Sequence, residues 1–322
     1  MNYLKKILFV ISVLFTVVSC TDSNVVDVSN IEVNSKLVRF DSLFYNADEV
    51  SLATLKANYP LMFPEEYSDS VWVNKINDSE EQKIYKKTVD VFGTFDKEYF
   101  EIVEVFKHIR YYFPRFNTPD VYTIISDFDY QYPVLFSGER LFVSLDMYLG
   151  AGEEEYSGFP EYLVRNMRPE RIKVDVSDAL LRTVMSKSPY DKTLLSQMVY
   201  SGKLLYLTQK MLPGEDASLV IGYSPEELKW CETNEAEIWT YLIKNKYIYN
   251  TDPRLTKRFI DVAPFTKFFL DMDRESPGRV GIWIGWQIVN SYMENNDVSI
   301  DDLVKNNDAR EIFVKSKYKP RK

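Results

Sequence analysis

The chain has 322 residues, of which 45% are hydrophobic, enough to bury a sizeable core. Its formal net charge of −9 argues against a general nucleic-acid binder, because phosphate binding needs a concentrated surface of lysine and arginine. With one histidine, His108, and two cysteines, Cys20 and Cys231, the chain lacks the ligands of a Cys/His zinc cage or of a catalytic zinc site with two or three histidines. We therefore expect no metal, no cofactor and no nucleic-acid partner.

The N-terminal residues predict a lipoprotein signal peptide. Two lysines precede an apolar run over residues 7–18, which is too short for a permanent membrane helix and leads into Ser19 and Cys20. The sequence Val-Val-Ser-Cys resembles a bacterial lipobox, in which the cysteine is acylated and the signal is removed before it. We expect residues 1–19 to be this signal and Cys20 to carry two or three acyl chains, which suffice for stable anchoring. The alternative is an ordinary signal peptide with an incidental cysteine.

The remaining residues predict one domain between two short terminal segments. Residues 20–30 are polar and lack periodicity, so we expect a tether between the bilayer and the domain. Residues 31–314 contain no convincing linker and predict a single α+β domain, mostly helical with a small β-sheet. Residues 315–322 carry four lysines and an arginine, and we expect a solvated, frayed tail, with contact to anionic lipid as the alternative. Once Cys20 is lipidated no internal disulfide remains, so stability must come from the core.

Hydrophobic periodicity predicts the strands and helices of this domain. The predicted strands cover residues 31–40, 121–125, 134–137 and 141–145, and the last two form a hairpin. The predicted helices cover residues 50–57, 67–76, 80–91, 95–113, 160–167, 174–185, 191–211 and 226–247. Ser224, followed by proline and two glutamates, marks a sharp helix start, and Asp308 has the same capping role for a last short helix.

The segment 276–293 predicts a buried central helix. Ser276 is a candidate N-cap with proline at the first helical position, and the helix is apolar almost all round, with Trp283 and Trp286 among its large side chains. Three glycines are spaced at i, i+3 and i+7 along one face: Gly278, Gly281 and Gly285. Glycine inside a helix costs about 1 kcal/mol relative to alanine, so we expect another backbone to approach this face closely. The alternative is a ligand-binding glycine helix.

Two chemical alternatives remain open. A carboxylate-based hydrolase would use a pair among four acidic residues, Asp127, Asp129, Asp146 and Glu153, because two carboxylates about 5 to 10 Å apart suffice for glycoside hydrolysis. A peptide- or glycan-binding module is favoured by the aromatic content of 15%, since rings offer flat, amphipathic contact surfaces. His108 lies in a predicted helix with no nucleophile-elbow sequence elsewhere in the chain, so we interpret it as structural.

Several motifs, in order and over essentially the whole chain, resemble the gliding motility lipoprotein GldB family. The matching segments are FKHIRYYFP (106–114), VSLDMYLG (143–150), DKTLLSQM (191–198), WCETNE (230–235), APF (263–265) and SPGRVGIWIGWQIVNSYMENN (276–296). The resemblance implies a lipid-anchored envelope component needed for surface gliding and functionally linked to the type IX secretion machinery. It also implies other gliding or secretion proteins as partners.

A weaker resemblance concerns the fold alone. The helix over residues 193–207, followed later by the glycine helix, is similar to the end of a family of predicted zinc hydrolases whose catalytic helix carries HExxH. In that alignment Gln197, Met198 and Ser201 replace the first histidine, the glutamate and the second histidine. None of them supplies the lost chemistry, so the resemblance implies a degenerate zincin-like scaffold without its metal. The alternative is a plain amphipathic core helix.

Together these observations predict a lipoprotein that faces the periplasm, is anchored in the inner or the outer membrane, and acts through protein contacts without catalysis.

Overall fold

The computed structural model describes residues 25–187 and 190–321, so the predicted lipobox with Cys20 lies outside the described residues. The chain divides into two compact units, residues 1–30 and residues 31–322. In the first unit the described residues end in a turn, where the backbone N–H of Ser29 donates to the carboxylate of Asp27. The second unit is an α+β domain, mostly helical with one small mixed sheet, as the sequence predicts.

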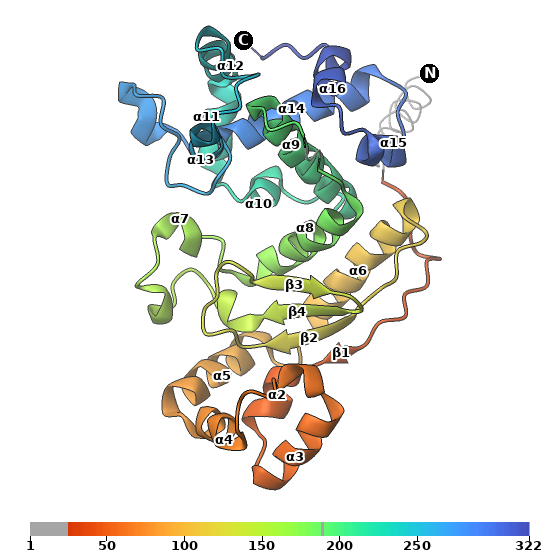
Figure 1. Ribbon diagram of the computed structural model, residues 1–322, viewed down its shortest axis with the longest axis vertical. Helices are drawn as coiled ribbons and strands as arrows, with labels where there is room; N and C mark the ends of the chain where they lie inside the picture. The colour runs from red at the N-terminus through yellow and green to blue at the C-terminus, as the bar shows by residue number, and fades with distance from the viewer. Residues whose placement is uncertain (1–24, 188–189, 322) are drawn as a thin grey trace, which may run out of the picture. The chain divides into compact units, whose positions relative to one another are not determined.

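The sheet has the strand order β1-β2-β4-β3 (Figure 1). Three strands run parallel, β1 (Leu37–Val38), β2 (Asp120–Ile124) and β4 (Arg140–Ser144). The edge strand β3 (Val134–Ser137) pairs antiparallel with β4. The hairpin between them turns at Gly138, whose φ of +63° favours a residue without a Cβ atom.

The predicted first strand, residues 31–40, is wrong in its length. Only Leu37 and Val38 pair with β2. Just before them, the Lys36 N–H donates to the side chain of Asp120 and the Ser35 hydroxyl donates to a backbone carbonyl, so side-chain bonds begin where the ladder stops. Helix α2 (Phe40–Tyr45) starts directly after the strand. The alternation of apolar and polar residues predicted a strand, but it did not show at which residue the pairing with β2 would end.

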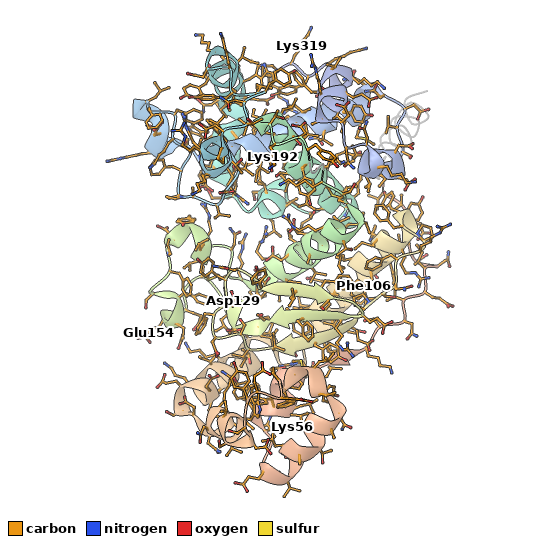
Figure 2. All side chains as sticks on the ribbon, viewed as in Figure 1. Lys56, Phe106, Asp129, Glu154, Lys192 and Lys319 are labelled. Atoms are coloured by element: carbon orange, nitrogen blue, oxygen red, sulfur yellow. The ribbon has the colours of Figure 1, made fainter. Side chains whose placement is uncertain are left out.

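Alternating side chains of the sheet face two hydrophobic clusters. Val121, Leu141 and Val143 belong to the main core, whereas Tyr122 and Phe142 pack into a smaller cluster. Helices from the N-terminal part build the smaller cluster: α2, α3 (Glu49–Asn58), α4 (Asp69–Asn77) and, at its margin, α5 (Ser79–Phe92). The main core includes α6 (Asp96–Tyr112), on which Figure 2 labels Phe106, and α8 (Ile172–Val184). The sheet therefore separates the two cores.

A pair of long helices organises the C-terminal half of the domain. α9 (Leu194–Met211) packs along α14 (Val280–Asn295), and both contact α16 (Ala309–Ser316). Shorter helices surround the pair (Figure 1): α10 (Ala217–Ile221), α11 (Pro225–Thr233), α12 (Glu235–Lys244), α13 (Pro253–Phe259) and α15 (Ile300–Lys305). α14 is buried almost all round, so the helix predicted to be central does lie in the middle of this half.

The helix predicted over residues 226–247 is two helices. The capping box predicted at Ser224 is present, because the Ser224 hydroxyl accepts from the N–H of Glu227 while the Glu227 carboxylate accepts from the N–H of Ser224. α11 ends at Thr233, and the side-chain amide of its C-cap, Asn234, donates to the carbonyl of Trp230. An asparagine that bonds back to its own helix competes with helical continuation, and α12 starts after it.

Backbone contact between α9 and α14 depends on two glycines. A Cβ atom on Gly285 would lie 1.9 Å from the carbonyl oxygen of Met198, and one on Gly202 would lie 2.2 Å from the carbonyl carbon of Gly285. Gly281 makes its close approach elsewhere, since its Cβ would lie 2.7 Å from the carbonyl oxygen of Phe259 in α13. Gly285 and Gly281 therefore bring the backbone of α14 close to two different helices.

The start of the glycine helix differs from the prediction. Ser276 is no N-cap: its hydroxyl lies 3.0 Å from the carbonyl of Thr266 and also accepts from the Thr266 N–H. The carbonyl of Pro277 also accepts from the Thr266 N–H, so these residues pair with a distant segment and helix α14 begins only at Val280. Gly278 consequently lies outside the helix, where its Cβ would lie 2.0 Å from a backbone oxygen of residue 263.

The basic segment 315–322 is not frayed over its first residues. Ser316 is fully buried, and Tyr318 is only 9% exposed and donates its hydroxyl to the carboxylate of Glu235 in α12 over 2.7 Å. The side-chain amides of Asn295 and Asn296, at the end of α14, donate to the last carbonyls of α16. These bonds satisfy the open end of α16 and hold the domain together beyond the boundary predicted at residue 314.

We predict that Gly285→Ala destabilises the domain. The added methyl group has to push α9 and α14 apart, and overpacking of this kind costs about 3 kcal/mol in the free energy of unfolding. Urea unfolding followed by circular dichroism measures the loss. Gly152→Ala is the matched control, because nothing lies within 4 Å of a Cβ atom at that position. Equal stability of the two variants would contradict the close contact of the helices.

Candidate functional site

The three degenerate metal-motif positions lie on α9 but form no site. Met198 is fully buried, and its carbonyl group contacts Gly285. Gln197 and Ser201 are half-buried on the same helix. Across residues 25–187 and 190–321, no three side chains of His, Cys, Asp or Glu gather in a way that could hold a metal ion. At Met198, α9 contributes packing against α14.

The histidine and the cysteine of the domain are both held in its interior. His108 is buried on α6, with Nδ1 2.9 Å from the carbonyl oxygen of Glu104 one turn earlier. Cys231 is fully buried on α11, and burial raises the pKa of its thiol well above the usual value. A protonated thiol is a poor nucleophile, so Cys231 is not placed for covalent chemistry.

The four carboxylates of the hydrolase alternative are each engaged in local contacts. Asp127 forms an ion pair with Lys75 over 2.8 Å, and Glu153 forms one with Lys87 over 2.6 Å. Asp129, labelled beside the sheet in Figure 2, accepts from the backbone N–H of Gln131. Each of these three carboxylates therefore interacts with a lysine or a backbone N–H group near it.

Asp146, the fourth of these carboxylates, is fully buried after β4. It accepts hydrogen bonds from the backbone N–H groups of Ser126 and Phe128, over 3.0 and 2.7 Å. Burial raises the pKa of its carboxyl group from 3.8 to about 6, against the opposing effect of these hydrogen bonds. The side chain fastens the loop that follows β2, and none of the four carboxylates lines the cavity described next.

A cavity of about 210 Å³ lies where the first turn of α8 meets the segments before α11 and α14. Four tyrosines line it, two of them fixed by hydrogen bonds. The hydroxyl of Tyr148 donates to the carboxylate of Asp175, and that of Tyr223 donates to the carbonyl of Gly278. The other two are Tyr130 and Tyr162. These rings give the cavity wall both apolar area and polar edges.

Three arginines, Arg165, Arg171 and Arg279, also line this cavity. Arg165 pairs with Glu227 over 2.6 Å. Arg171 pairs with Asp175 and donates to the carbonyls at the end of α10. Two of the three therefore have carboxylate partners.

The third arginine, Arg279, stands directly before α14 in a left-handed conformation with φ of +61°. Its guanidinium donates to the carbonyl of Ile221 and lies 5.9 Å from the ring centre of Tyr223. Among the residues that the structure describes, no carboxylate forms an ion pair with it. Burial, reinforced by the positive charges of Arg171 and Arg165, lowers the pKa of Arg279.

Sequence reasoning missed this arginine cluster. Arg165, Arg168 and Arg171 recur every third residue in RNMRPER, and the Nε atom of each is buried without a hydrogen-bond partner in the described part of the chain. The spacing was a usable signal, but Arg279 joins the cluster from more than a hundred residues away through tertiary folding.

We predict that Asp146 makes stability depend on pH between about 4 and 6. In this range the folded carboxyl group keeps a proton that the unfolded chain releases, so the free energy of unfolding falls as the pH rises. Asp146→Asn removes this effect. Relative to wild type, the variant should gain on the order of 2 kcal/mol between pH 4 and pH 7 in urea unfolding. The exposed Asp129→Asn is the control, and an equal gain there would refute the assignment.

Comparison with known proteins identifies the family. Residues 21–320 match the family model described as gliding motility protein GldB. The searches of the curated proteins and of the solved structures found no match. Across the described residues, no helix combines the length and the apolar character needed to span a bilayer. The family match covers nearly the whole chain, and the chain belongs to the GldB family of gliding motility proteins.

Proposed function

We propose that this chain is a lipid-anchored envelope protein that acts without catalysis, through contacts with other components of the gliding and type IX secretion machinery. Membership of the GldB family makes it a gliding-motility-related lipoprotein associated with the cell envelope. The single observation that carries the proposal is the family match over residues 21–320. The anchoring, the contacts and the link to secretion are the parts that need experiments.

Two features support the anchor. The lipobox-like sequence ends at Cys20, and the family match begins at the next residue, Thr21. An acylated Cys20 would therefore begin the mature chain and place residues 20–30 between the lipid and the domain. The domain would then face the periplasm from the inner or the outer membrane.

Exposed apolar side chains support a role in protein contacts. Phe269 is 77% exposed and has a φ of +60°, which is unusual for a bulky residue, and Leu270 beside it is 52% exposed. Next to them an apolar hollow of about 420 Å³ is lined by Tyr241, Phe268 and α12. A strained, exposed phenylalanine beside an apolar hollow suits insertion into a partner's apolar surface.

We predict that Cys20→Ala abolishes acylation and impairs gliding. Labelled palmitate incorporation and the fractionation of membranes measure the anchor, and colony spreading measures gliding. Cys231→Ala is the matched control. Cys231 is buried in the domain, so its replacement should leave acylation unchanged. Palmitate label that remains in the Cys20 variant would contradict the assignment of Cys20 as the anchor.

We predict that Phe269→Asn slows gliding without unfolding the domain. Asparagine tolerates the left-handed backbone, so the substitution removes the exposed ring and its contact with the Arg258 guanidinium, 4.6 Å from the ring centre, and keeps the backbone conformation. Val314→Asn is the control, since Val314 is 65% exposed but lies on α16. Crosslinking from position 269 in a gliding strain should capture a gliding or secretion component repeatedly. Normal gliding by the Phe269 variant would remove this surface from the proposal.

A further inference from the structure

We propose that the cavity lined by Arg165, Arg171 and Arg279 binds the phosphate group of a small phosphomonoester. The inference goes beyond the role in gliding and concerns a ligand site. It rests on the charge of the cavity, on the unpaired donors of the arginines that line it, and on its size.

The charge of the cavity favours an anion. Three guanidinium groups line it against one carboxylate, Asp175, which Arg171 and the hydroxyl of Tyr148 already occupy. Arg165 has Glu227 as its partner. This leaves Arg279 as a partly buried cation without a carboxylate among the described residues, and such a group is costly to leave uncompensated.

The position of Arg279 is fixed before any ligand arrives. Its left-handed backbone costs about 1 kcal/mol or more for a residue with a Cβ atom, and the contacts around it maintain that conformation. The Ile221 carbonyl and the Tyr223 ring hold the guanidinium in place. The residue also precedes the sixteen residues of α14, whose N-terminal dipole adds positive potential. A cation held in advance loses little entropy when an anion binds.

Unpaired donors on the lining arginines suit an oxyanion with several acceptor atoms. The Nε atoms of Arg165 and Arg171 are buried and have no hydrogen-bond partner in the described residues. Guanidinium groups bind phosphate through paired, charge-assisted hydrogen bonds, which are about twice as strong as neutral ones. A phosphate offers oxygens to several guanidinium groups at once, whereas a carboxylate offers only two, so the cluster favours phosphate.

The size of the cavity leaves room for a small organic group. A volume of about 210 Å³ exceeds the space that an inorganic phosphate needs, and Tyr130 and Tyr162 line the same cavity. Their rings present flat, amphipathic surfaces to a polyol or a sugar attached to the phosphate. A soluble ester and a lipid headgroup share this chemistry.

Binding to the full-length, detergent-solubilised protein tests the proposal. Calorimetric titration with glycerol 3-phosphate represents the soluble ester, mixed micelles containing phosphatidic acid represent the lipid headgroup, and succinate represents a carboxylate of similar size. We expect glycerol 3-phosphate or phosphatidic acid to bind with a Kd of about 1 mM or tighter. Whichever of the two phosphate compounds binds shows whether the natural ligand is a soluble ester or a lipid headgroup. Binding in neither phosphate arm, or equally tight binding of succinate, would overturn the proposal.

Variants locate the binding. Arg279→Met should weaken phosphate binding about tenfold or more, because a charged hydrogen bond is lost. Arg165→Met should also weaken phosphate binding. Because the side chain of Arg165 is partly exposed, this second variant tests the proposal if Arg279→Met does not fold. Arg254→Met is the control, since Arg254 lies on α13, is largely exposed and pairs with Asp252. Unchanged affinity in a folded Arg279 or Arg165 variant, or equal weakening in the control, would place the binding elsewhere.

Discussion

The domain depends on the direct contact between the backbones of α9 and α14. Gly202 and Gly285 lie against each other across this contact, and neither position has space for even a methyl group. The contact brings two largely apolar helices to a distance at which many weak dispersion interactions act together. α8, α10, α13, α15 and α16 pack on one or both of these helices, so the position of each follows from the same pair.

The end of α14 that approaches α13 also shapes the arginine cavity. Gly281 lets α14 pass close to the backbone of Phe259, and Gly278 lets the preceding residues pass close to another chain segment. Arg279, between these two glycines, is thereby held beside Ile221 and Tyr223. The close packing that stabilises the domain thus also confines a cation that has no carboxylate partner in the described chain. The segment 278–281 therefore contributes both to the close helix packing and to the proposed ligand site.

Much of the fold was readable from the sequence because it follows local rules. The sheet's hairpin, the long helices and the capping box at Ser224 each depend on residues that are near one another in the chain. The errors have a common physical cause. Ser276 has the sequence of a cap but bonds to Thr266, and the basic tail contains Tyr318, which bonds to Glu235. In both cases a distant partner overrides the local preference.

The candidate site was less readable than the fold. The glycines of α14 indicated that another backbone approaches this helix closely. The sequence did not indicate that Gly202 is the contact on α9, because a single glycine in an amphipathic helix gives no information about which residue it packs against. The arginine cavity combines RNMRPER with Tyr223 and Arg279, which come together only in the folded domain.

The docking of Tyr318 against α12 also bears on the order in which the chain can fold. The two glycines that join α9 to α14 are about eighty residues apart, so their contact closes a long loop and has a high entropic cost. The strands and helices before α9 are synthesised before either glycine of this contact. The helical half cannot be completed until α14, α16 and finally Tyr318 have been synthesised. A chain that stops before Tyr318 would lack the hydrogen bond to Glu235 and the ring contact with Trp239 that fasten its C-terminal end to α12.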